Sequence, residues 1–299
     1  MRTLNEYIKL PQKKLFKTIK NDFPSAVFRK DKYILVPGEA PILLVAHLDT
    51  VHHDNVTVIC KSDDGNILMS PQGIGGDDRC GVYGIIKAYE NANIKPWLLF
   101  TCDEEVGGVG ARQFANDLPM KDKLEKIALI VELDRKGKTD AVYYDCECPE
   151  LEKYIESKGY KTEWGSYSDI YDIAPALGVA AVNLSSGYYN AHTQHEFINV
   201  KHLENTIEKV IEIVNESPTL SQFIYEESYA SYDTYYTYGG FDEKKLKGNL
   251  LWYWNELLTI FTEKELIEYC EASGMEVIVD LYWDCFMDKH DPKVVNYGW

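Results

Sequence analysis

The sequence has no apolar run long enough to cross a bilayer and is poor in basic residues. It contains 31 Lys and Arg against 48 Asp and Glu, which gives a net charge of −17. A transmembrane helix needs about 20 consecutive apolar residues, and phosphate binding needs clustered Lys and Arg. We therefore expect neither a membrane nor a nucleic acid as partner. The acidic excess is typical of a solvated surface, and it also lets an acidic site attract cations.

Cysteine pairs with zinc-finger spacing are missing too. The seven cysteines are odd in number and spread out, and Cys146-Glu147-Cys148 is too closely spaced for the usual zinc knuckle. Residues 1–20 lack the continuous apolar segment of a signal peptide, and their spaced Leu, Ile and Phe predict one amphipathic helix. Reduced thiols and no signal peptide lead us to expect a cytoplasmic location.

Strand and helix patterns alternate from about residue 40 to residue 216. That order predicts an α/β fold, a three-layer α/β/α domain with a mostly parallel central sheet. We expect this domain over residues 1–216, a Tyr-rich linker over 217–240, and a small, mainly helical C-terminal extension of unknown role over 241–299. Predicted strands cover residues 27–36, 42–46, 56–61, 66–70, 96–101, 127–133, 141–144 and 179–184. Predicted helices cover residues 81–92, 110–116, 149–158, 168–177, 200–216, 243–261 and 263–273, while 276–286 fits a strand or a further helix.

An apolar strand leads straight into His47, and Asp49 follows two residues later. This arrangement places the imidazole at the sheet edge, with a carboxylate close enough to orient or polarise the ring. An isolated His-x-Asp is more often a surface histidine beside an unrelated aspartate. This motif therefore indicates a metal site only in combination with the other acidic and histidine segments described below.

Two further acidic pairs follow loops or strands. Asp77-Asp78 comes after a glycine-rich stretch, and glycine permits the close backbone approach that a carboxylate shared by two cations requires. The alternative is a glycine turn with an Asp helix cap. Glu104 and Glu105 end an apolar strand and cannot both point the same way, so one can bind metal while the other acts as a general base. The alternative here is an acidic loop.

An aspartate and a histidine complete the series. Asp134 ends a buried strand, and Glu132 on the same strand face is its competitor. His192 follows the third buried strand with Glu196 four residues later, and His195 is its competitor. We predict surface positions for three further histidines, namely His52, His53 and His202.

Together these segments supply two sets of three ligands that share one aspartate. The sets are His47, Asp77 and Asp134 for one cation, and Asp77, Glu105 and His192 for the other. Each set leaves a position for water, as a catalytic zinc site requires. Two neighbouring cations need a bridging carboxylate and a spare carboxylate to activate water, and Asp77 and Glu104 fit these two roles.

From about residue 42 to residue 216 these residues resemble the co-catalytic di-zinc exopeptidase clan of bacterial leucyl aminopeptidase, peptidase T and carboxypeptidase G-like metallopeptidases. The interval between Asp134 and His192 is too short for a lid domain, so the chain is most similar to the compact aminopeptidase branch. In that clan the first His binds metal and its Asp orients the ring, which here are His47 and Asp49. The remaining positions match Asp77 as bridge, Glu104 as base, and Glu105, Asp134 and His192 as ligands.

The resemblance implies a metal-dependent amide hydrolase, an aminopeptidase or short-peptide exopeptidase, with a peptide or aminoacyl substrate. It implies two divalent metal ions, for which we expect zinc, with cobalt or manganese as alternatives. A homo-oligomer is compatible with it. Two alternatives remain: an N-acyl-amino-acid deacylase that uses the same metals, and a non-catalytic metal-binding module.

Overall fold

The computed structural model describes residues 2–165, 167–227, 248–273, 278 and 281–282. The chain divides into two compact units, Met1–Glu227 and Ser228–Trp299. Within the part of the chain that the structure describes, every helix is too short or too polar to cross a bilayer.

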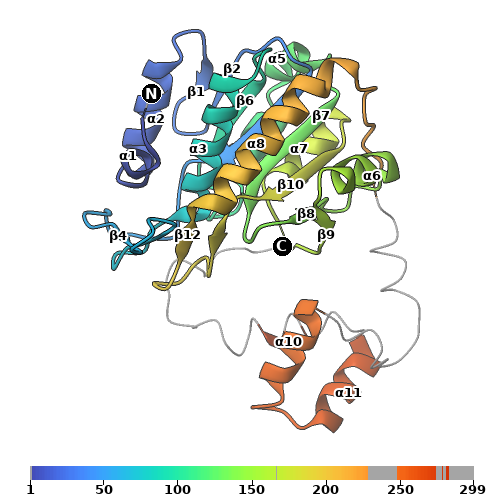
Figure 1. Ribbon diagram of the computed structural model, residues 1–299. Coiled ribbons are helices and arrows are strands. Elements are labelled where there is room, and N and C mark those ends of the chain that lie inside the picture. The colour runs from blue at the N-terminus through green and yellow to red at the C-terminus, as the bar shows by residue number, and fades with distance from the viewer. Residues whose placement is uncertain (1, 166, 228–247, 274–277, 279–280, 283–299) are drawn as a thin grey trace. The chain divides into compact units, whose positions relative to one another are not determined.

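The first unit is built on an eight-stranded sheet (Figure 1). In spatial order its strands are β1 (Val27–Arg29), β2 (Tyr33–Val36), β6 (Trp97–Thr101), β3 (Ile42–His47), β7 (Leu129–Arg135), β10 (Ala181–Ser185), β8 (Asp140–Val142) and β9 (Lys161–Thr162). The four central strands β6, β3, β7 and β10 are parallel to one another, whereas β2 and β8 join them antiparallel. The predicted α/β class with a mostly parallel central sheet is confirmed.

Helices cover both faces of the sheet and bury it. On one face lie α3 (Gly76–Asn91) and α8 (Val200–Glu216), which cross the sheet side by side in Figure 1. On the other face lie α4 (Val109–Ala115) and α7 (Ile170–Leu177). Strand β3 is buried throughout: Leu44 joins the α3 and α8 core, and Leu43 joins the α4 and α7 core. A parallel strand covered on both faces has this continuous apolar sequence.

A second, four-stranded sheet connects distant parts of the chain. Its order is β11 (Tyr188–Tyr189), β12 (Phe197–Asn199), β5 (Ile67–Met69) and β4 (Cys60–Lys61). The β4–β5 hairpin was predicted, although both strands are shorter than expected. The pairing of β12 with β5 was not predicted, and it brings the segment around residue 192 beside the loop that precedes α3.

The N-terminal helix prediction is wrong in one respect. Residues 1–20 do not form one helix but two, α1 (Leu4–Ile8) and α2 (Gln12–Asp22), with residues 9–11 between them. Proline has no backbone N–H to donate within a helix, and it disfavours helical backbone at the preceding residue. The break therefore follows from Pro11.

The single strand predicted over residues 27–36 is a hairpin. Strands β1 and β2 pair antiparallel, and the turn between them contains Asp31 at φ 54°. The turn consists of residues 30–32, which are all charged, and Tyr33 is the start of the buried strand.

Several predicted helices are confirmed. Helix α8 has the predicted bounds, and so does α11 (Glu263–Ser273), where the Thr262 hydroxyl donates to Glu265 at 2.7 Å in the predicted capping box. Helix α10 (Gly248–Leu257) is shorter than the predicted 243–261, of which 243–247 lie outside the described residues. Helix α6 (Pro149–Ser157) begins at the predicted proline, and the short α5 (Leu118–Lys121) was not predicted.

Residues after 216 bear on the division of domains. Ile224 and Glu227 form bridges with Val179 and Cys146, so the segment up to residue 227 packs on the first unit. The second unit has its own apolar cluster, which consists of Trp254, Leu257, Leu266, Cys270 and Ile278. Residues 228–240 of the predicted linker and most of 276–286 lie outside the described residues.

Candidate metal centre

The candidate ligands gather at the carboxyl ends of the parallel strands. His47 ends β3, Glu104 and Glu105 follow β6, and Asp134 lies near the end of β7. His47 pairs in register with Thr101, so the ends of β3 and β6 meet at the same edge. Open α/β sheets place their sites at this edge.

The His47 ring is fully buried and held from two sides. Nδ1 lies 3.3 Å from Oδ1 of Asp49, and Nε2 lies 3.0 Å from Oδ1 of Asp77 and 3.6 Å from Oδ1 of Asp134. With its proton on Nδ1, the ring donates to Asp49 and keeps the Nε2 lone pair for a cation. The backbone N–H of His47 donates to Asp78, which fixes the strand end.

Asp49 also holds the acidic loop after β6. Its two oxygens accept hydrogen bonds from the backbone N–H groups of Glu104 at 3.1 Å and Glu105 at 3.0 Å. Burial raises the pKa of Asp49, but the hydrogen bonds from His47 and from the two amides outweigh it and keep the pKa below its ordinary value. One carboxylate thus orients the histidine and positions both glutamates.

Asp77 lies in a non-helical turn at the start of α3. Its backbone has φ −83° and ψ 100°, and its peptide bond to Asp78 is cis. Its N–H donates to Oε1 of Glu196 at 2.9 Å, while Oε2 of Glu196 accepts from Gly75 N–H. A Cβ at position 81 would lie 2.3 Å from an Asp78 oxygen, so Gly81 is required for the turn to pack.

His192 approaches the other oxygen of the shared aspartate. Its Nε2 lies 3.2 Å from Oδ2 of Asp77 and 3.1 Å from Oε2 of Glu105. Its side chain is 56% exposed, unlike that of His47. The two histidines therefore face the two oxygens of one carboxylate, one from inside the fold and one from the surface.

Asp134 is positioned by residues that the sequence did not single out. The Ser168 hydroxyl donates to Oδ2 at 3.1 Å and the Tyr188 hydroxyl to Oδ1 at 3.3 Å. The side chain of Asn183 hydrogen-bonds both the backbone N–H and the C=O of Asp134. Its competitor Glu132 is fully buried and lies 2.6 Å from the same Ser168 hydroxyl, which has a single proton for the two carboxyl groups.

Three groups of described residues have ligand atoms within 4.8 Å of one another. They are His47 with Asp77 and Asp134, Asp77 with Glu105 and His192, and His47 with Glu104 and Glu105. The first two are the sets expected from the sequence, and the third places Glu104 beside them. Glu132 and His195 belong to none of these groups.

The surface prediction for His52 is wrong. Its side chain is only 12% exposed, and Nε2 lies 2.8 Å from Oε2 of Glu196. Glu196 supports the Asp77 turn and His52, whereas the sequence had associated it with His192. These contacts depend on tertiary packing, which residue spacing does not reveal. His53 is exposed as predicted, and His202 is half-buried beside the Tyr189 hydroxyl.

The site concentrates acidic groups away from water. Burial raises the pKa of Glu104 to about 10, helped by the charges of Asp134, Asp169 and Glu105. Burial and the charge of Asp77 raise the pKa of Asp134 to about 7. Hydrogen bonds to Asp77 and Glu105 raise the pKa of His192 to about 11. A negative potential strong enough to hold these protons also attracts divalent cations.

The donor set fits two divalent cations. Imidazole and carboxylate ligands suit zinc, and carboxylates also suit manganese. Oε1 of Glu105 is buried and has no hydrogen-bond partner among the described residues. Because a buried polar atom normally has a partner, this oxygen supports a cation between Glu105 and its neighbours.

The fold is shared with solved aminopeptidases. Aminopeptidase PepT from Bacillus cereus ATCC 10987 is 16% identical with a TM-score of 0.56, over 72% of this chain and 97% of that protein. A tripeptidase from Staphylococcus aureus subsp. aureus Mu50 is 12% identical with a TM-score of 0.58, over 73% and 97%. A TET aminopeptidase from a marine sediment Thaumarchaeota archaeon is 13% identical with a TM-score of 0.53, over 70% and 94%.

These neighbours confirm, at the level of the fold, the resemblance to the exopeptidase clan. No protein-family profile matches the sequence, and no curated protein matches it.

Proposed function

We propose that this chain is a metal-dependent amide hydrolase, an aminopeptidase or short-peptide exopeptidase that uses two zinc ions. The observation that carries the proposal is the position of Asp77 between two ligand sets, with Glu104 beside them. The similarity to solved aminopeptidases supports the same class of reaction. The proposed catalytic domain is residues 1–216, and the proposed location is the cytoplasm.

His47, Asp77, Asp134, Glu105 and His192 would hold the cations. When bound, the cations would supply Lewis-acid polarisation of the scissile carbonyl and of the attacking water. Glu104 would accept the proton of that water and pass it to the leaving amine. Burial favours the protonated form of Glu104 and a nearby cation favours the carboxylate, so the two effects together would bring its pKa toward neutrality.

A substrate panel separates the proposed activity from its alternatives. The purified chain would be loaded with Zn²⁺, Co²⁺ or Mn²⁺ and assayed on aminoacyl amides, dipeptides, tripeptides and N-acyl amino acids. We expect turnover on substrates with a free N-terminus and none after chelation. Preferential turnover of N-acyl amino acids would favour the deacylase, and bound metal without any turnover would favour the non-catalytic module.

A further inference from the structure

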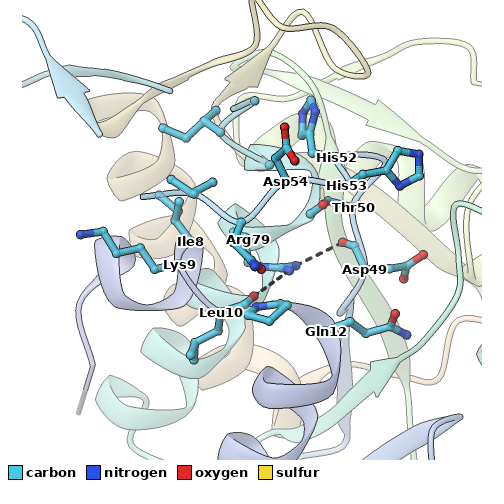
Figure 2. Close-up of a pocket in the computed structure, with 16 residues that line it drawn as sticks. Ile8, Lys9, Leu10, Gln12, Asp49, Thr50, His52, His53, Asp54 and Arg79 are labelled. Atoms are coloured by element: carbon cyan, nitrogen blue, oxygen red, sulfur yellow. Dashed lines mark hydrogen bonds between the residues drawn. The ribbon is translucent and has the colours of Figure 1, made fainter. Parts of the chain in front are cut away.

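A cavity of about 230 Å³ lies beside Asp49, which supports the candidate metal centre (Figure 2). Its walls come from the N-terminal arm (residues 2–22), the segment after β3 and the turn before α3. Asp49 lines it, and so does Arg79, two residues after the shared aspartate. None of the five candidate ligands is among its lining residues. The cavity therefore borders Asp49 and Arg79, which lie next to the metal centre in sequence or contact, and not the candidate ligands themselves.

Arg79 connects three segments at this cavity. It is 3% exposed, and Nη1 donates to the backbone carbonyls of Leu48 at 2.9 Å and Asp49 at 3.1 Å. Nη2 donates to the carbonyl of Leu10 at 3.1 Å. In Figure 2 the guanidinium lies between Leu10 and Asp49, joined to both by dashed lines. A planar guanidinium can hold such diverging acceptors at once, whereas an ammonium is a point charge.

The N-terminal arm also contacts the acidic loop that carries Glu104 and Glu105. Nε2 of Gln12 donates to Oδ1 of Asp103 at 2.8 Å. Asp103 immediately precedes Glu104 and has φ 61°, a left-handed conformation that is uncommon for residues other than glycine. A hydrogen bond to its side chain helps to hold that conformation, and so the direction in which the acidic loop leaves β6.

We propose that Arg79 and Gln12 are positioning residues through which the N-terminal arm sets the geometry of the metal centre. Arg79 fixes the backbone that carries Asp49, which in turn orients His47 and both glutamates. Gln12 fixes the start of the loop that carries Glu104. The inference rests on the proposed function, because it requires that these residues bind metal.

Arg79 and Gln12 bind no metal in this proposal, but we expect their loss to weaken metal binding. Residues that orient ligands typically change metal affinity or activity about 10- to 100-fold when they are replaced. Arg79 holds backbone carbonyls at Leu48 and Asp49, and Gln12 holds the side chain of Asp103 next to Glu104. Loss of either contact would move ligands without removing any. We expect weaker metal binding and, at a fixed metal concentration, a lower kcat.

The test compares Arg79→Ala and Gln12→Ala with two controls in the full-length chain. Lys13→Ala removes an exposed side chain next to Gln12, and Ile19→Val removes a buried methyl group on α2 away from the cavity. Zn²⁺ affinity is measured by titration calorimetry against a competing chelator, and stability by urea unfolding. We expect Zn²⁺ affinity to fall about 10- to 100-fold in Arg79→Ala and about 10-fold in Gln12→Ala. Both controls should keep wild-type affinity.

Guanidinium provides a second readout for Arg79. Arg79→Ala enlarges a cavity that already exists, so millimolar guanidinium can enter and replace the lost donors. We expect it to restore Zn²⁺ affinity in this variant, and an equal concentration of ammonium to restore much less. If Arg79→Ala does not fold, Gln12→Ala decides the question, because Gln12 is only half-buried.

Three outcomes would overturn the inference. If the wild-type chain binds zinc and both variants bind it with unchanged affinity, the inference is refuted and the proposed function stands. Equal loss of affinity in Ile19→Val would show that any weakening of the arm has this effect. A wild-type chain that binds no divalent cation would refute the proposed function and the inference together.

Discussion

Nε2 of His192 lies 3.2 Å from Oδ2 of Asp77, although the two residues are far apart in the sequence. The contact exists because β12 pairs with β5 and carries the chain after β10 back beside the loop before α3. Nε2 of His47 lies 3.0 Å from Oδ1, the other oxygen of the same carboxylate. A single aspartate thus connects a buried histidine to an exposed one.

Replacement of the shared aspartate should remove both cations. Asp77→Ala is expected to bind no zinc tightly, because both ligand sets lose a member. Asp134→Ala and His192→Ala each interrupt one set and should retain about one equivalent. Elemental analysis of the dialysed proteins checks the counts. Equal zinc content in all three variants would show that Asp77 is not shared.

Glu104→Gln should separate turnover from metal binding. The amide cannot accept the proton of the attacking water, so kcat should fall on the order of 10²-fold or more. Zinc content should stay at the wild-type value, because Glu104 belongs to neither main ligand set. Glu125→Gln, the same change at an exposed position, is the control and should keep full activity. Undiminished turnover by Glu104→Gln would remove Glu104 as the base.

Zinc binding should release protons. In the absence of metal the pKa of His192 is raised to about 11 and that of Glu104 to about 10, so both groups carry protons at neutral pH. His192 must lose its proton to bind a cation, and a nearby cation favours the carboxylate form of Glu104. Apparent affinity should therefore rise with pH, and titration in buffers of different ionisation enthalpy should reveal the released protons. Binding without proton release would contradict this account.

Asp117 offers a stability test remote from the metal centre. It accepts hydrogen bonds from Arg29 and from the buried Tyr33 hydroxyl, both at 2.6 Å, and these lower its pKa. Because its folded pKa lies below its unfolded value of about 4, the stabilisation is present above pH 4. It is lost as pH falls through the folded value. Asp117→Asn should cost about 1 kcal/mol at pH 7, since Arg29 is half-exposed and solvent screens its charge.

Urea unfolding of this variant at pH 7, and at the lowest pH where the fold persists, checks the sign. The difference in free energy of unfolding between Asp117→Asn and wild type should become smaller at low pH. Asp122→Asn, a nearby change at an exposed residue, should show little effect at either pH. A difference in free energy of unfolding that becomes larger at low pH would contradict a lowered pKa of Asp117.

Much of the fold was predictable because apolar strands with buried faces have a clear sequence pattern. The strand that leads to His47 and the helix at residues 200–216 are examples. The strand ends also indicated which acidic residues and histidines to group. The geometry that places them within reach of shared cations comes from the register of parallel strands.

The remaining features depend on contacts between distant residues. Glu196 supports the Asp77 turn through backbone N–H groups, and no side-chain pattern marks a backbone donor. His52 is largely covered, and its Nε2 contacts Glu196, which is far from it in the sequence. The division of the N-terminal helix could have been predicted from Pro11, since proline removes a helical donor.

The most direct test is a crystal structure of the zinc-loaded chain with anomalous data collected at the zinc absorption edge. Our account predicts two peaks about 3.5–4 Å apart, one beside His47 and Asp134, the other beside Glu105 and His192, with Asp77 between them. A single peak, or two peaks that do not share Asp77, would contradict it.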